Sequence, residues 1–183
     1  MVKIAISGFH GTGKSTIGSI LAEKLNLKHY STGDAFRSLA KEKGMSLREF
    51  SMYVEDNPDI DEMLDQKVIT KTSKHENIVV DSLLSGYLLK DIADFKVLLT
   101  APLKTRVKRM TERDDTNYQK KLSETKFRER SEIERFKDLY NIDLEEEILK
   151  KQIFDLIIET QHYSVKEIAN MIIAKMKERA IVE

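Results

Sequence analysis

The strongest chemical signal in the sequence is a glycine-rich segment near its start. Residues 8–15 read GFHGTGKS and match the pattern G-x-x-x-x-G-K-[ST], between an apolar run and a helical pattern. Glycines let backbone N–H groups turn toward phosphate oxygens, and the following helix N-terminus adds positive partial charge. We predict a nucleotide-phosphate site in which Lys14 reaches the β and γ phosphates and Ser15 binds Mg²⁺.

A second candidate segment, STGDAFR at residues 31–37, follows the second apolar run. In a parallel sheet such a segment lies at the carboxyl ends of the strands, where ligands bind. One interpretation is helix capping by Thr32 or Asp34, with Arg37 as a surface charge. The other is that Thr32 orients an acceptor nucleotide and Arg37 binds its phosphate. The preceding glycine-rich segment favours the second interpretation.

An aspartate, Asp81, ends the apolar run at residues 77–81. A carboxylate at this position can bind a Mg²⁺-bound water or orient an active-site arginine. The alternative is an aspartate that caps the next helix. Because we expect this strand to lie beside the first one, we favour the role near the metal and the acceptor.

Arginines are concentrated in residues 103–130, which hold ten basic and five acidic residues. Arg109 and Arg113 are four residues apart and share a helix face, and Arg128 and Arg130 follow a polar connection. A solvated charged helix is one interpretation. A closing lid is the other, because phosphoryl transfer requires charge neutralisation and the exclusion of water.

Short apolar runs alternate with helical patterns along the chain. Strands are expected at residues 2–7, 27–31, 77–81, 95–100 and 153–158, and helices at 14–26, 34–43, 46–55, 59–75, 103–113, 117–139 and 164–181. The alternation predicts an α/β fold with a parallel sheet and right-handed crossovers.

Composition narrows the function classes. The 183 residues include 31 Lys and Arg, 31 Asp and Glu and no cysteine, so the formal net charge is zero and thiolate metal sites are excluded. Zero net charge argues against nucleic acid as the partner, and no apolar stretch is long enough for a membrane span. We expect a monomeric, cytoplasmic, single-domain protein.

Several motifs resemble known kinases. The segment at 31–37 resembles the adenylate-kinase group of nucleoside monophosphate kinases. GMSLREF at 44–50 with NPDID at 57–61, RERSE at 128–132, FKDLYNID at 136–143 and FDLIIET at 154–160 are similar to the archaeal-type cytidylate kinases. The order and spacing of these motifs extend the resemblance over nearly the whole chain.

The resemblance implies a three-layer P-loop NTPase fold with a five-stranded parallel sheet in the order 2-3-1-4-5. It implies a core of residues 1–31, 76–113 and 136–183, an acceptor-binding segment at 32–75 and a lid at 114–135. The reaction would be phosphorylation of CMP or dCMP by ATP with Mg²⁺.

The resemblance also assigns roles to individual residues. The expected catalytic residues are Lys14, Arg113, Arg128 and Arg130. ATP would contact Gly8, Phe9, His10, Gly11, Thr12, Gly13, Lys14, Ser15, Thr16 and Arg109, which lies near the adenine. The acceptor would contact Thr32, Arg37 and Asp81, and Mg²⁺ would contact Ser15 and Asp81.

One departure affects the acceptor. After the third strand the family usually has an acid, a small residue and arginine, whereas here Asp81-Ser82-Leu83 lacks the arginine. Arg48 is a candidate substitute. Two alternatives therefore stay open: a kinase of another small acceptor, such as AMP, another deoxynucleotide or a metabolite, and a P-loop nucleotide switch that binds RNA or protein.

Overall fold

The computed structural model describes residues 1–182, with the backbone alone for residues 147–149. Its centre is a parallel sheet of five strands in the order β2-β3-β1-β4-β5. The strands are β1 (Val2–Ser7), β2 (Lys28–Ser31), β3 (Asn77–Asp81), β4 (Phe95–Thr100) and β5 (Leu156–Glu159). The predicted fold class and strand order are confirmed.

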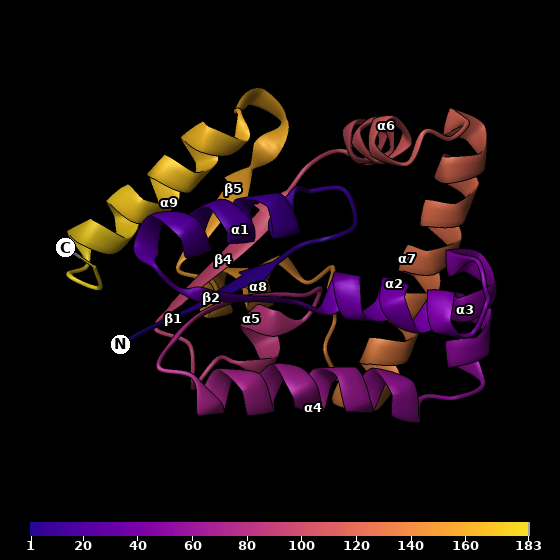
Figure 1. Cartoon of the computed structure of the whole chain (residues 1–183), viewed down its shortest axis with the longest axis horizontal. Helices are drawn as coiled ribbons and strands as arrows, with labels where there is room; N and C mark the ends of the chain where they lie inside the picture. Colours follow the sequence, from indigo (N-terminus) through magenta and orange to yellow (C-terminus); the bar gives the residue numbers. More distant parts are fainter. Residues whose placement is uncertain (183) are drawn as a thin grey trace.

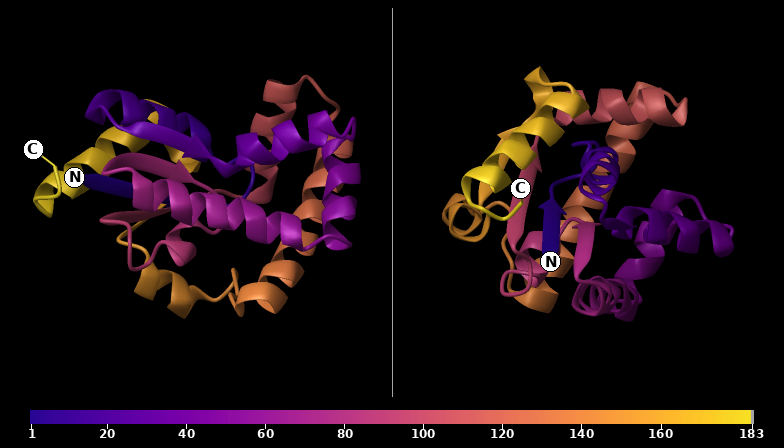
Figure 2. Two further views of the ribbon diagram at one scale, coloured as in Figure 1. Left: turned by 60° about the horizontal axis from the view of Figure 1, so that its bottom comes forward. Right: turned by 60° about the vertical axis from the view of Figure 1, so that its left-hand side comes forward.

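Helices cover both faces of the sheet (Figure 1). α1 (Lys14–Leu25) and α9 (Val165–Glu178) lie side by side over one face, and α4 (Asp59–Lys74) and α5 (Ser85–Leu88) lie over the other (Figure 2). Alternate residues of β1 point to opposite faces, so Ile4 and Ile6 pack with α1 and α9 while Ala5 packs with α4. This burial on both faces explains the continuous apolar character of the strands.

Four helices extend beyond the carboxyl ends of the strands (Figure 1). They are α2 (Thr32–Glu42), α3 (Leu47–Glu55), α6 (Leu103–Asp114) and α7 (Tyr118–Tyr140). Phe36, Phe50, Val54 and Leu64 form a separate apolar cluster that joins α2, α3 and α4. α7 packs against both α3 and α6.

Local signals fix several element boundaries. Ser46 and Ser164 each cap a helix and form a capping box with the glutamate three residues later. α7 is continuous from residue 118 to 140, so the predicted boundary between lid and core at 135/136 falls inside a helix.

The fifth strand differs from its prediction. Residues 147–153 form α8 (Glu147–Ile153), and β5 begins only at Leu156. A 3-10 turn, η1 (Thr160–His162), follows it. Within residues 1–182 no helix is both long and apolar enough to cross a bilayer.

Candidate active site

The glycine-rich loop lies between β1 and α1, as predicted, and its conformation requires glycine. Gly8, Gly11 and Gly13 have φ angles of 148°, 78° and 96°. A Cβ on Gly11 would come within 2.6 Å of the carbonyl oxygen of Arg106, and one on Gly8 would clash with the carbonyl oxygen of Leu99. Close packing against α6 and β4 therefore fixes the loop path, and side chains are excluded at these two positions.

The side chain of Lys14, at the start of α1, folds back over the glycine-rich loop. Its Nζ donates a 3.0 Å hydrogen bond to the carbonyl of Phe9, and the Thr12 hydroxyl donates to the same oxygen at 2.9 Å. Burial lowers the pKa of Lys14 to about 8. A partly desolvated ammonium group beside free helix N–H groups is well placed to bind phosphate oxygens.

A cluster of oxygen atoms surrounds the start of α1. Strand pairing aligns Ser31 and Ile6 with Asp81, and the Ser15 hydroxyl donates to Asp81 Oδ1 at 2.8 Å. Asp81 is buried, and His29 Nε2 lies 2.7 Å from its Oδ2. Among the described residues no three His, Cys, Asp or Glu side chains gather as a metal cluster. One hydroxyl and one carboxylate suit Mg²⁺, which usually takes its remaining ligands from water and substrate phosphates.

A cavity of about 500 Å³ opens above the loop. It is bounded by the glycine-rich loop, α2, α6, the first half of α7 and the start of α9. The predicted site residues that line it are His10, Gly11, Thr12, Gly13, Lys14, Ser15, Thr16, Arg37, Asp81, Arg109, Arg113 and Arg128. Guanidinium groups from α2, α6 and α7 thus meet one space, which is large enough for a nucleotide.

The arginines of this cavity are held by oxygen atoms of the protein. Arg109 donates to the hydroxyl and the carbonyl of Thr160, both at 2.8 Å. Arg113 pairs with Asp114 at 2.6 Å, and Arg37 pairs with Asp34. Burial favours a higher pKa for the Asp114 carboxyl, but Arg113 and Lys121 lower it to about 2. Oxygen atoms of the protein therefore orient these guanidinium groups.

Some predicted residues lie elsewhere. Arg130 is 82% exposed at its side chain, pairs with Glu134 at 3.0 Å and does not line the cavity. Gly8 and Phe9 line a small pocket on the β4 side of the loop, although the carbonyl of Phe9 still binds Lys14. Thr32 lines a smaller neighbouring cavity.

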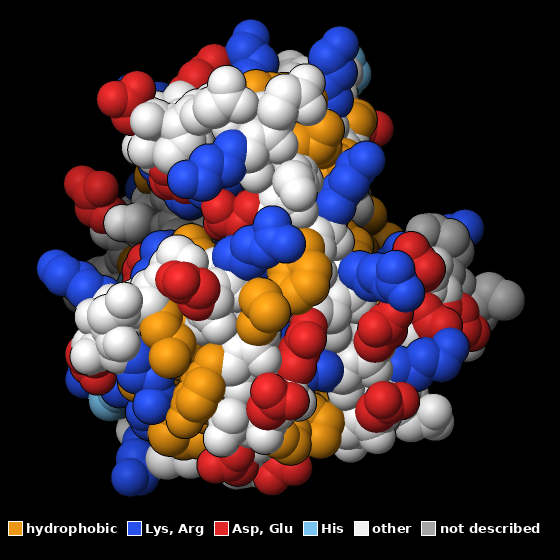
Figure 3. All heavy atoms as spheres, turned by 90° about the vertical axis from the view of Figure 1, so that its right-hand side faces the viewer, with side chains coloured by type: hydrophobic (Ala, Val, Ile, Leu, Met, Phe, Trp, Pro, Cys, Tyr) orange, Lys and Arg blue, Asp and Glu red, His pale blue; other side chains and the backbone are white. Residues whose placement is uncertain are grey.

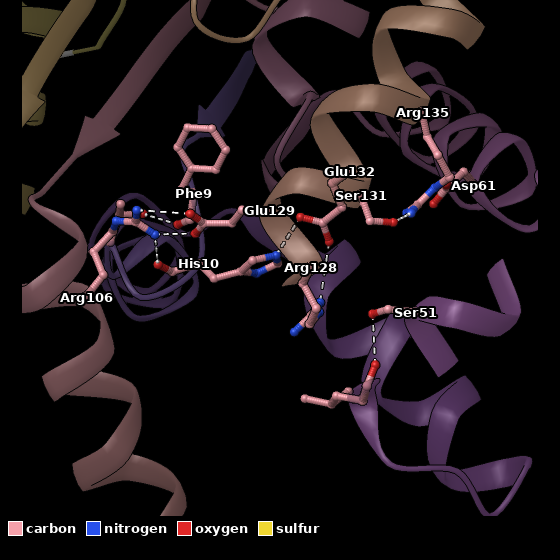
Figure 4. Close-up of polar contacts among 12 residues, drawn as sticks. Phe9, His10, Ser51, Asp61, Arg106, Arg128, Glu129, Ser131, Glu132 and Arg135 are labelled. Carbon is pink, nitrogen blue, oxygen red and sulfur yellow. Dashed lines mark hydrogen bonds and ion pairs between the residues drawn. The ribbon is translucent and has the colours of Figure 1, made fainter. Parts of the chain in front are cut away.

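Sequence reasoning missed the contacts that α7 makes with the loop (Figure 4). Arg106 donates to the carbonyl of His10 at 3.0 Å and pairs with Glu129, and His10 Nε2 lies 2.7 Å from Glu132 Oε2. Lys121 is also buried and binds Asp114 at 2.9 Å. The three-residue spacing of Glu129 and Glu132 indicates a shared helix face. Their partners lie far away in the sequence, so spacing alone could not identify them.

Comparison with known proteins identifies the family. The model of the AAA domain family matches residues 4–137. A cytidylate kinase from Aeropyrum pernix is 40% identical over 176 residues, which cover 96% of this chain and 99% of that protein. One from Sulfurisphaera tokodaii is 39% identical over 92% of each chain, and one from Archaeoglobus fulgidus is 38% identical over 98% and 97%. The chain belongs to the cytidylate kinase family.

Solved structures support the fold of this cytidylate kinase family member. Shikimate kinase from Acinetobacter baumannii, solved with shikimate, superposes with a TM-score of 0.62 at 16% identity and covers 98% of this chain and 94% of its own. Shikimate kinase from Aquifex aeolicus has a TM-score of 0.57 at 16% identity, with 100% of each chain covered. At this identity the likeness extends to the fold alone.

The cytidylate kinase family resemblance led us to expect an arginine where this chain has Leu83. The structure packs Leu83 against an apolar cluster that includes Tyr87 and Phe136, at the wall of the smaller cavity. Arg48, the candidate substitute, lies 5.3 Å from the ring centre of Phe127 and lines neither the main nor the smaller cavity. The structure therefore does not place Arg48 as a replacement.

Proposed function

We propose that the protein transfers the γ-phosphoryl group of ATP to CMP or dCMP, giving ADP and CDP or dCDP. The observation that carries this proposal is the single cavity in which the glycine-rich loop meets guanidinium groups of α2, α6 and α7. The names of the relatives, at about 40% identity over nearly the whole chain, favour a cytidine nucleotide as the acceptor.

ATP would bind with its phosphates in the loop at residues 8–16. The backbone N–H groups and Lys14 would contact the β and γ phosphates, and Arg109 would lie near the adenine. Arg113 and Arg128, which line the cavity, would neutralise charge on the transferring group. Ser15 and Asp81 would hold Mg²⁺, and such an ion, when bound, adds positive charge beside the phosphates. Arg130 has no part in this proposal.

The acceptor would bind on the α2 side, with Arg37 at its phosphate and Thr32 near its nucleoside. An oxygen of that phosphate attacks the γ-phosphorus, a new P–O bond forms, and the bond to the β–γ bridging oxygen breaks. ADP leaves with that oxygen, and no covalent intermediate forms on the protein. The residues of the site supply position and charge.

We also propose that residues 114–135 act as the lid and residues 32–75 as the acceptor segment. α3 and α7 already touch, and the guanidinium of Arg128 lies 5.2 Å from the ring centre of Phe36. Closure over the cavity would exclude water, which otherwise hydrolyses ATP.

Acceptor-dependent ADP release tests the proposal. We expect turnover with CMP or dCMP above that with AMP, UMP and GMP, and a loss of several orders of magnitude in Lys14→Ala. A loss below tenfold would contradict the role of Lys14. ADP release that needs no acceptor would favour a nucleotide switch instead. The face in Figure 3 gives that alternative no support, because positive and negative side chains are interspersed over it.

A further inference from the structure

The smaller cavity, which Thr32 and Leu83 line, has a volume of about 80 Å³ and is called the second cavity from here on. It adjoins the main cavity and shares His10, Lys14, Gly33 and Arg128 with it. The side chains of Phe36 and Phe136 supply part of its apolar wall. Its volume is a small fraction of that of the main cavity. The space therefore suits one ring of a ligand whose phosphate lies in the main cavity.

Two carboxylates of α4 line this second cavity, and α7 fixes one oxygen of each. Arg135 Nε donates to Asp61 Oδ2 at 2.7 Å (Figure 4), and the Tyr140 hydroxyl donates to Asp65 Oδ2 at 2.9 Å. Among the described residues, leaving aside the side chains of 147–149, no hydrogen bond reaches Oδ1 of either aspartate. The two acids differ in charge balance: a guanidinium neutralises Asp61, whereas Asp65 has only a neutral phenol.

Asp65 is therefore in an unfavourable position for a carboxylate. It is 7% exposed, and burial raises its pKa to about 7, with a further contribution from the nearby charge of Asp61. A buried charge without a cation is destabilising, and such groups are concentrated at functional sites.

A second polar group that lines the same cavity has unused hydrogen-bonding capacity. The hydroxyl of Thr32 is buried, and no hydrogen-bond partner reaches it. Buried hydroxyl groups nearly always have a partner, so a ligand is expected to complete this one. This observation is independent of the two aspartates, because Thr32 belongs to α2.

The Oδ1 atom of Asp65 determines which functional group a bound ring must present. As a carboxylate oxygen it accepts hydrogen bonds, and an exocyclic amino group supplies the donor. Cytosine presents this amino group at C4, whereas uracil presents a carbonyl oxygen, which a carboxylate repels. A purine has a second ring and therefore needs more space than a pyrimidine in this cavity of about 80 Å³.

We propose that Asp65, held by Tyr140, determines the base specificity of the acceptor site by accepting a hydrogen bond from the amino group of a cytosine ring. This inference rests on the proposed function, because it takes the acceptor base to enter the second cavity. Thr32 then contacts the same ring or its sugar. Asp61 acts through the Arg135 ion pair, as a positioning residue.

The test compares kcat/KM for CMP and UMP in the wild type and in Asp65→Asn. Asparagine keeps an oxygen for Tyr140 and adds an N–H donor that can serve the uracil carbonyl. We expect the CMP:UMP ratio to fall at least tenfold, through a higher KM for CMP, while the KM for ATP stays within twofold. Asp91→Asn, an exposed change outside both the acceptor segment and the lid, is the control and should leave the ratio unchanged.

The possible outcomes distinguish the base-specificity role of Asp65 from the proposed kinase activity. A CMP:UMP ratio within twofold of the wild type in Asp65→Asn, with CMP turnover intact, overturns the inference and leaves the proposed function standing. A wild-type protein that phosphorylates no nucleoside monophosphate overturns both. Should Asp65→Asn fail to fold, Tyr140→Phe takes its place, because it frees the carboxylate without removing it. We expect at least a threefold fall in the ratio there, and an unchanged ratio contradicts the role of Asp65.

Discussion

His10 Nε2 lies 2.7 Å from Glu132 Oε2, which joins the glycine-rich loop to α7 through a partly buried contact. Burial lowers the pKa of His10, and because the Glu132 carboxylate can only accept, the Nε2–H of His10 is the donor of this hydrogen bond. Burial would raise the pKa of Glu132, but His10, Arg128 and Arg135 lower it to about 2. The helix that carries Arg128 is therefore attached to the loop that would bind ATP.

The Glu132 contact predicts a stability that depends on pH. Because the folded-state pKa lies below the ordinary value of 4.5, the ionised form stabilises the fold above that pH, and this contribution is lost as the pH falls toward 2. Glu132→Gln should lower the free energy of unfolding at pH 7 by about 1–3 kcal/mol. Urea titrations at pH 7 and pH 3 should show the difference shrinking at the lower pH. An equal difference at both pH values would contradict this account.

The raised pKa of Asp65 predicts a pH dependence of stability opposite in direction to that of Glu132. Its folded-state pKa of about 7 lies above the ordinary 3.8, so the native state binds the proton more tightly and loses stability as the pH rises from 4 to 7. Asp65→Asn should therefore be more stable than the wild type at pH 8, by about 1–4 kcal/mol, and similar near pH 4. Thermal unfolding at the two pH values measures this. A variant that is less stable at pH 8 would show that Asp65 is already compensated.

Arg128 and Arg130 should differ in their effect on turnover. Arg128 lines the main cavity at 11% side-chain exposure, and Arg130 is 82% exposed on another face of α7. We expect Arg128→Ala to lower kcat about a hundredfold and Arg130→Ala less than threefold, on the scale of one charge-stabilising group. Steady-state kinetics at saturating ATP decides. Equal losses in the two variants would require that α7 rotates on closure.

Gly11 of the glycine-rich loop and Gly44, which lies outside it, have similar backbone conformations but different surroundings. Both have positive φ, 78° and 67°, but a Cβ on Gly11 would lie 2.6 Å from the Arg106 carbonyl oxygen, and one on Gly44 would meet nothing within 4 Å. Gly44→Ala should cost about 1 kcal/mol of folding stability from its backbone angle alone. Gly11→Ala should also weaken ATP binding at least tenfold. Calorimetric titration with ATP compares them, and equal affinities would contradict the tight loop geometry.

The sequence predicted the parts of the molecule that depend on local patterns. The loop at residues 8–15 was predicted because its motif has a strand pattern before it and a helix pattern after it. The position of Asp81 beside this loop followed from the predicted pairing of β3 with β1. The fifth strand was placed too early because the apolar run at 153–158 serves both the end of α8 and the start of β5. Apolarity alone does not separate a helix end from a buried strand.

The arginines of α7 show what helix geometry adds. Residues 128 and 130 are about 200° apart around a helix, so their side chains leave α7 in nearly opposite directions, and the motif alone gave no reason to choose between them. Asp65 and Tyr140 are distant in the sequence, and their contact exists only because α7 packs beside α4. Such contacts depend on tertiary packing, which the spacing of residues does not encode.

Transfer of a labelled phosphoryl group tests the central claim most directly. The protein is incubated with CMP, Mg²⁺ and ATP that carries heavy oxygen in its γ-phosphoryl group, and the products are analysed by mass spectrometry. We predict CDP that carries the heavy oxygens, ADP in equal amount and little labelled inorganic phosphate. Label that appears in inorganic phosphate at the same rate with and without CMP would contradict the proposed kinase.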